Sequence, residues 1–175
     1  KGSLALGSNG LTLTSGASIS GNGAITGSTS SILSFTGTGN SSLPLLSVET
    51  LNIARSSGTI SASAAVDVTH LRIGLDASST SSFAMGSHTL KLGNTPITNG
   101  TGKLTVSNLE AASSSMITLP SNITALSTLT LDSGAILTSN SAKLTVTTLN
   151  LLSNAILTAS SGSIVATTAN VSASA

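Results

Sequence analysis

Apolar and polar residues alternate along this chain, and the alternation recurs at a regular interval. The segments Leu129–Leu137 and Leu149–Leu157 carry almost the same pattern, one repeat apart. The segment Leu11–Ile19 repeats their apolar phase far upstream of Leu129. Strand-type alternation with a period of about 20 residues is typical of coils that stack on copies of themselves. The sequence therefore predicts one repeat unit that spans the chain.

A six-residue pattern marks each repeat: apolar, polar, polar, apolar, polar, apolar. The spacing between the fourth positions of successive copies is nearly constant along the chain. The fourth positions of the nine copies are Leu11, Leu33, Leu51, Leu71, Leu90, Leu109, Leu129, Leu149 and Ala169.

Each repeat is expected to contain three short strands separated by corners. Alternate residues of a strand face the same side of a sheet. Leu129 and Leu131 are therefore expected to point inward and Thr130 outward. The adjacent polar residues Thr147 and Thr148 interrupt the alternation, which predicts a corner between two strands. Segments rich in Ser, Asn and Gly predict the other corners, because these residues favour turns.

These features predict an all-β fold, a right-handed parallel β-helix (β-solenoid) of about nine turns of roughly 20 residues. Residues 1–175 are expected to form a single solenoid domain, which is either a segment of a longer rod or a filament subunit. A helical fold is disfavoured because no long segment shows the helical period of about 3.6 residues. A β-sandwich is the structural alternative, but it needs turns every 8–12 residues or so without a longer repeated phase.

The composition excludes several functional classes. Serine and threonine make up about a third of the 175 residues, 6% of the residues are charged, and the formal net charge is +1. Nucleic-acid binding normally needs a cationic surface and stacking aromatic side chains, but the chain has no Trp, no Tyr and two Phe. No cysteine is present for a disulfide or a thiolate metal site. No apolar run approaches the roughly 20 residues of a membrane-spanning helix. We therefore expect no nucleic-acid partner and no membrane span.

Charged and histidine residues on neighbouring repeats form a candidate polar patch. The expected register places Arg72, Lys91 and Glu110 in one outward column, about 5 Å apart. It places Glu49 and His88 in the adjacent column, two repeats apart, with Thr69 between them. The patch is either a glycan-binding or hydrolytic site, or a solvated face whose charges happen to stack, and we favour the solvated face. Its members are Glu49, His70, Arg72, His88, Lys91 and Glu110.

The sequence nominates no catalytic residue, no cofactor-binding residue and no metal ligand. An enzymatic β-helix needs convergent carboxylates for metal binding or acid–base chemistry. Asp67, Asp76 and Asp132 instead fall on different repeats and corners. Neither histidine has a neighbouring sequence that nominates a nucleophilic serine. We expect the chain not to be an enzyme.

Three apolar residues are expected to face outward in one column. If Ile117, Leu137 and Leu157 point inward, their neighbours point outward. Either a bend tucks these outward residues into a corner, or they form a lateral contact strip between rods, because contiguous exposed apolar surface is usually an interface. The three residues are Met116, Ile136 and Ile156.

Both ends of the sequence are in repeat phase, and neither carries a Pro or a charge cluster that would block a strand edge. Open edges at terminal coils invite further strand pairing. We therefore expect the rod to be continued, either within a longer chain or by head-to-tail docking of subunits.

The Leu-x-Leu anchors, the regular coil length and the corners rich in Ser, Thr, Asn and Gly resemble the filamentous-haemagglutinin-like and autotransporter-passenger β-helices of bacterial surface proteins. The resemblance covers the chain in its style of repeat and includes no diagnostic motif. It implies a secreted or cell-surface rod that supports adhesion or forms a fibre.

We expect a structural extracellular solenoid that forms or extends a surface fibre or adhesin stalk. Its expected partners are further copies of itself, further repeats of a longer chain, and host or surface glycans. The alternative is a carbohydrate-active β-helix enzyme, of the polysaccharide lyase or hydrolase type, that uses the patch around His70, Arg72 and His88.

Overall fold

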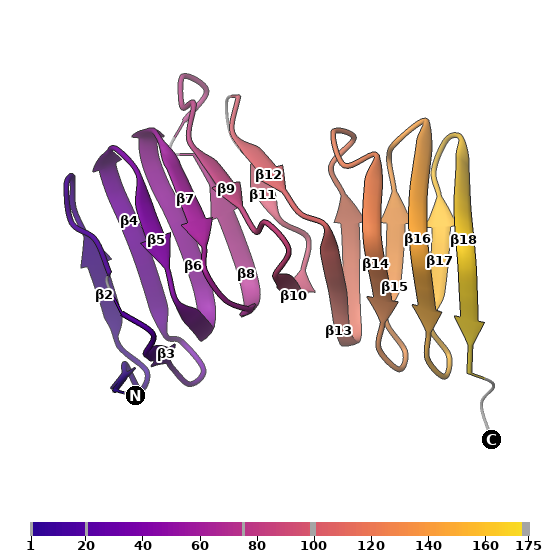
Figure 1. The fold of residues 1–175 in the computed structure, drawn as a ribbon, viewed down its shortest axis with the longest axis horizontal. Coiled ribbons are helices and arrows are strands. Elements are labelled where there is room, and N and C mark those ends of the chain that lie inside the picture. The colour runs from indigo at the N-terminus through magenta and orange to yellow at the C-terminus, as the bar shows by residue number, and fades with distance from the viewer. Residues whose placement is uncertain (1, 20, 75, 99–100, 173–175) are drawn as a thin grey trace.

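The computed structural model describes residues 2–19, 21–74, 76–98 and 101–172. These residues form strands and turns that stack into an elongated rod, with β2 near one end and β18 at the other (Figure 1). They include no helix long and apolar enough to cross a membrane. The strands are β1 (Ser3–Ala5), β2 (Gly10–Leu13), β3 (Ala24–Thr26), β4 (Ile32–Thr38), β5 (Ser41–Leu43), β6 (Leu45–Ser57), β7 (Thr59–Ala62), β8 (Val66–Ile73), β9 (Ser82–Ala84), β10 (Thr89–Asn94), β11 (Ile97–Thr98), β12 (Lys103–Thr105), β13 (Asn108–Leu119), β14 (Ala125–Leu131), β15 (Ile136–Ser139), β16 (Lys143–Leu151), β17 (Ile156–Ala159) and β18 (Ser163–Val171).

The strands belong to two parallel sheets. The larger sheet has 14 strands. Nine of them follow the path β1-β3-β6-β8-β10-β13-β14-β16-β18, and the other five, β2, β4, β11, β15 and β17, pair beside that path. The smaller sheet has four strands in the order β12-β9-β7-β5. Strands that are neighbours in a sheet are mostly separated in sequence by one circuit of the chain. The expected right-handed parallel β-helix is therefore confirmed, with about eight turns.

The turn count follows from the nine copies of the six-residue pattern. These copies lie on nine strands that stack in chain order, so they enclose about eight complete circuits. The strands that carry them are β2, β4, β6, β8, β10, β13, β14, β16 and β18.

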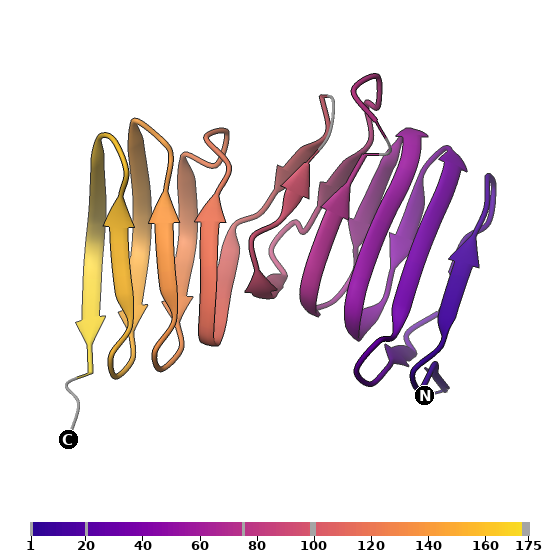
Figure 2. The same ribbon diagram turned by 180° about the vertical axis from the view of Figure 1, so that it is seen from behind.

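The corner expected at Thr147 and Thr148 is a bend inside one continuous strand. β16 runs from Lys143 to Leu151 without a break, although neither threonine side chain is buried. In these C-terminal coils the third strand of one repeat therefore merges with the first strand of the next. Each such coil consists of one long bent strand and one short strand, which lie on opposite sides of the rod (Figure 2).

Inward side chains stack on equivalent residues of the next coil and form one continuous apolar core. Leu109, Leu129 and Leu149 are in register on successive strands, and all three are buried. Fully burying a Leu side chain contributes roughly 1.5–3 kcal/mol. The core is therefore a set of columns that run along the rod, and every coil adds one residue to each column.

The pairing of the six-residue pattern is displaced between β8 and β10. Leu71 and Leu90 hold the same position of the six-residue pattern, but the structure pairs Leu90 with Val66 and Leu92 with Val68. Val66-x-Val68 offers the same pair of inward apolar residues as Leu71-x-Ile73, so Leu90-x-Leu92 can stack on either pair. Because Leu90 and Leu92 stack on Val66 and Val68, the circuit between β8 and β10 contains more residues than the usual interval between copies of the six-residue pattern.

Candidate functional site

The polar patch is divided into two groups, and the first lies on β6 and β8. Glu49 Oε1 is 3.7 Å from His70 Nε2, and Thr69 Oγ1 donates a 3.1 Å hydrogen bond to Glu49 Oε2. The side chains of Glu49 and His70 are 30% and 47% exposed. Glu49 and Thr69 are therefore neighbours, as the sequence predicted.

The expected place of His88 in this column was wrong. Gly93 packs against Thr69 instead, so closely that a Cβ atom on Gly93 would lie 3.0 Å from the Thr69 Cα. His88 lies in the turn before β10, where its backbone N–H donates to the carbonyl of Met85 over 3.0 Å. The cause is the register change at β10. Because Leu90 pairs with Val66 and not with Leu71, the residues around Leu90, His88 among them, lie several positions away from their expected partners on β8.

The second group is centred on Lys91 of β10. Lys91 and Glu110 are register partners, and Lys91 Nζ donates to Glu110 Oε1. Lys91 Nζ also donates to Asp132 Oδ2 over 2.8 Å. These hydrogen bonds, first that to Asp132 and then that to Glu110, raise the pKa of Lys91 above its usual range. The neighbouring positions of Lys91 and Glu110 are thus confirmed.

Arg72 does not belong to the Lys91 column, contrary to the expectation. Arg72 pairs with Ile97 of β11, whereas Lys91 is the register partner of Asp67. Sequence reasoning also missed Asp132, which it treated only as a turn residue. The position of Asp132 directly after Leu131, one coil beyond Glu110, was the signal that could have found it.

Glu110 and Asp132 meet at Lys91, and the other described carboxylates do not join them in an ion pair. Asp76 accepts hydrogen bonds from Ser78 Oγ and from the Ser78 backbone N–H, over 2.6 and 2.9 Å, and these bonds lower the pKa of Asp76. Asp67 is exposed and forms no ion pair with another described residue. The described residues contain no group of three or more His, Asp or Glu side chains that could hold a metal ion.

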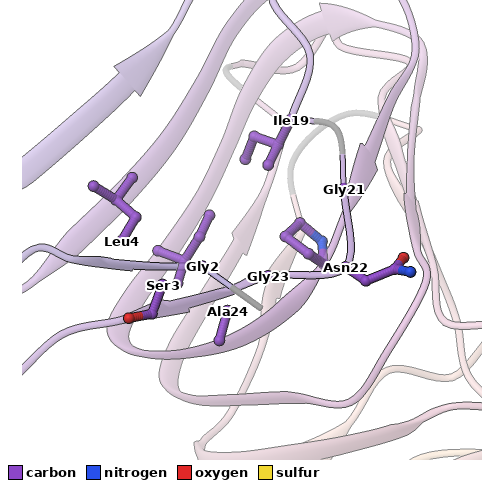
Figure 3. A pocket seen from close by; sticks show the side chains of 10 residues that line it. Gly2, Ser3, Leu4, Ile19, Gly21, Asn22, Gly23 and Ala24 are labelled. Carbon is purple, nitrogen blue, oxygen red and sulfur yellow. The ribbon is translucent and has the colours of Figure 1, made fainter.

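Two cavities lie on the N-terminal half of the rod. One, of about 430 Å³, lies at the N-terminal end between the segments 2–4 and 19–25. Figure 3 shows its Gly-rich wall, with the Asn22 side chain pointing away from the other labelled residues. The other, of about 350 Å³, lies over β3, β6 and β8 and is bordered by Lys91 and Glu110. The described lining of the first cavity has no charged residue. Three charged residues line the second cavity: Lys91 and Glu110 form an ion pair with each other, and Asp67 forms none with another described residue.

Arg55 is a buried charge that sequence reasoning overlooked. Its side chain is fully buried, donates to the carbonyl of Gly39 and to Ser41 Oγ, and lies 5.4 Å from the Phe35 ring centre. Its Nε has no hydrogen-bond partner. The alternation Leu51, Ile53, Arg55 was the signal, because it gives all three residues the same inward direction.

The three apolar residues of the expected strip do form one outward column. Met116 pairs with Ile136, and Ile136 pairs with Ile156. Met116 is 68% exposed and Ile156 is 49% exposed, so these two side chains are not tucked into a corner.

Comparisons with protein-family models, with curated proteins and with solved structures found no match for this chain.

Proposed function

We propose that this chain is a structural β-solenoid that forms or extends a secreted or cell-surface fibre, adding coils end to end through open strand edges. The observation that carries this proposal is the open edge of β18. Among the described strands, β18 pairs with β16 on one side and has no partner on the other.

The apolar columns of the core end uncovered at β18. Leu144 and Val146 of β16 are fully buried, whereas their register partners Ile164 and Ala166 of β18 are only half-buried. Val171, at the end of β18, is 70% exposed. A further coil on β18 would bury these side chains and pair the free backbone groups of the edge. At the other end of the rod, β1 and β2 each pair with one described strand only.

An outward side-chain ladder also grows by one member for each coil. Asn150 Nδ2 donates to Thr130 Oγ1 over 3.2 Å, and Asn170 Nδ2 donates to Asn150 Oδ1 over 2.9 Å. Both bonds point back toward the preceding coil. A coil added to β18 can therefore extend this ladder with the same hydrogen-bond direction.

The composition supports an extracellular structural role. The chain has no cysteine that would be exposed to oxidation outside the cell, and it is rich in hydroxyl groups and poor in charge. Its repeat style is similar to that of bacterial surface β-helices, in which the rod carries or forms an adhesive fibre. An adhesin stalk or fibre is the proposal that fits these properties.

End-to-end stacking is tested by negative-stain microscopy of the purified chain and of two lysine variants. The wild-type chain is expected to form filaments whose length grows with protein concentration. Ala169→Lys is expected to abolish them, because the next coil would have to bury an ammonium group over the Leu149 column. Thr168→Lys is the matched control, since it adds the same charge on the outward side of the same strand. Discrete wild-type particles, or filaments that survive Ala169→Lys, would overturn the stacking.

A further inference from the structure

One face of the C-terminal coils carries no charged residue. It consists of the outward residues of the second half of β13, of β15 and of β17, which lie side by side in Figure 2. One column on this face is Met116, Ile136 and Ile156. The adjacent column is Thr118, Thr138 and Thr158. We call this surface the Ile/Thr face.

The threonine column satisfies part of its own hydrogen bonding. Thr138 Oγ1 and Thr158 Oγ1 lie 3.0 Å apart and share a hydrogen bond. Thr158 Oγ1 also reaches the carbonyl oxygen of Leu137, at 3.5 Å. Because these hydroxyl groups are already paired within the chain, the face can lose water without leaving every hydroxyl unpaired.

The charge distribution selects the partner. From position 111 to the C-terminus the sequence contains only two charged residues, Asp132 and Lys143. Asp132 is already bonded to Lys91, and Lys143 begins the opposite long strand β16. A charged polymer therefore finds no complementary group on the Ile/Thr face. A second copy of the same face meets no like-charge repulsion, and the regular spacing of strands allows two such sheets to interdigitate.

The size of the face decides when this contact forms. Three strands at about 4.8 Å and four residues at about 3.3 Å give a face of about 14 Å by about 13 Å, or roughly 200 Å². Stable interfaces bury about 800 Å² on each partner. One pair of faces is therefore too small to hold two single chains together at ordinary concentrations. Chains stacked end to end present one such face per copy, and the many weak contacts then act together.

We propose that the Ile/Thr face pairs with the same face of a second copy and joins two stacked filaments laterally. This inference rests on the end-to-end stacking proposed above. Lateral pairing determines the width of the fibre, whereas the edge at β18 determines its length. The two contacts can therefore be separated by mutation.

The first test is the filament width in electron micrographs of the I136T/I156T variant. This variant keeps β-branched residues in both strands and makes the apolar column hydroxylated. Wild-type filaments are expected to be paired, and those of the variant to be single, with a width reduced about twofold and an unchanged length. The double variant I32T/L45T is the matched control, because it changes two exposed apolar residues, 41% and 47% exposed, on the N-terminal coils. Unchanged paired filaments in I136T/I156T, or single filaments in the wild type, would overturn the proposal.

A second measurement tests the face without filaments. In the A169K background, which is designed not to stack, sedimentation equilibrium at about 1 mM chain is expected to detect a weak dimer with a Kd of roughly 1 mM. The dimer is expected to disappear in A169K/I136T/I156T. A strictly monomeric A169K chain at this concentration would overturn lateral pairing. Absence of wild-type filaments combined with a weak A169K dimer would overturn the stacking alone.

Discussion

At the scale of single residues, Arg55 is the side chain least expected inside a solenoid core. It is fully buried, and no carboxylate among the described residues forms an ion pair with it. Burial removes water from the guanidinium group, so the pKa of Arg55 is lowered from its usual value. Two hydrogen bonds and the Phe35 ring offset only part of this desolvation, and Nε stays unpaired.

We therefore expect Arg55→Met to leave the free energy of unfolding unchanged or to raise it by about 1 kcal/mol, because an apolar side chain of similar length removes the buried charge. Arg55→Ala is expected to lower the same free energy by about 3 kcal/mol, because it leaves a cavity beside Phe35. Urea unfolding of both variants measures the two values. A loss in Arg55→Met as large as that in Arg55→Ala would show that the hydrogen bonds of the guanidinium outweigh its desolvation.

Lys91 is the second residue whose charge affects stability. It lies between two carboxylates, and its pKa is raised by both. Lys91→Met is expected to lower the free energy of unfolding by about 1 kcal/mol, less at high salt. A lysine whose pKa is higher in the folded than in the unfolded state contributes its stability fully below the ordinary value of 10.5. The contribution is lost as the pH rises above that value.

The measurement is the stability difference between the wild type and Lys91→Met from neutral to strongly alkaline pH. We expect a constant difference up to about pH 10 and a shrinking one above it. Lys103→Met is the control, because Lys103 is exposed and forms no ion pair with a described residue. A difference that grows with pH in the alkaline range would contradict the assigned role of Lys91.

At the scale of elements, the close stacking of corners restricts which residues can occupy them. Gly58 connects β6 to β7 with a φ of +105°, and a Cβ atom there would clash with the carbonyl oxygen of Gly39 in the preceding coil. Gly86 also has a positive φ, +56°, but a Cβ atom on it would meet nothing within 4 Å. At Gly58, the neighbouring coil leaves no room for a side chain. At Gly86, only the positive φ of the residue itself disfavours a side chain.

Gly58→Ala is therefore expected to lower the free energy of unfolding by about 3 kcal/mol or more, because backbone strain and a clash add together. Gly86→Ala is expected to lower it by only about 1 kcal/mol, the penalty of a left-handed conformation alone. Thermal or urea unfolding compares the two variants. Equal losses would contradict the idea that contact between coils limits the Gly58 corner.

At the scale of the whole molecule, the parallel ladders make the rod a stack in which each coil contacts mainly its two neighbours. The stability of such a stack is close to a sum over coils and the contacts between them. In the proposed fibre, further coils on the edge of β18 would extend this stack in length, and pairing of the Ile/Thr faces would extend it in width. The register change between β8 and β10 is the one place in the described stack where the repeated pairing of the six-residue pattern is displaced.

Much of the fold could be predicted from the chain, because each coil repeats the same inward residues. The spacing of Leu129 and Leu149 alone predicts their pairing, and the structure confirms it. The outward column of Met116, Ile136 and Ile156 followed from the same alternation. The burial of Arg55 could have been predicted by the same rule, which shows that direction along a strand is a stronger signal than residue type.

The geometry of the polar patch was harder to predict. Glu49 and Thr69, and Lys91 and Glu110, are neighbours because their coils keep the regular register. The expected contact between Arg72 and Lys91 was wrong, because the register changes between β8, which carries Arg72, and β10, which carries Lys91. The bond from Lys91 to Asp132 spans two coils diagonally and depends on how a long side chain extends.

The sequence by itself determined the coil, its period, its inward columns and the near absence of charge on its C-terminal coils, because these depend on local alternation and composition. Only the tertiary structure decided on which pair of apolar residues Leu90 and Leu92 stack. Val66-x-Val68 and Leu71-x-Ile73 are equivalent as local patterns, so no local rule distinguishes them. The choice depends on how the whole circuit between β8 and β10 fits around the core, and it determines which charged side chains meet on the surface.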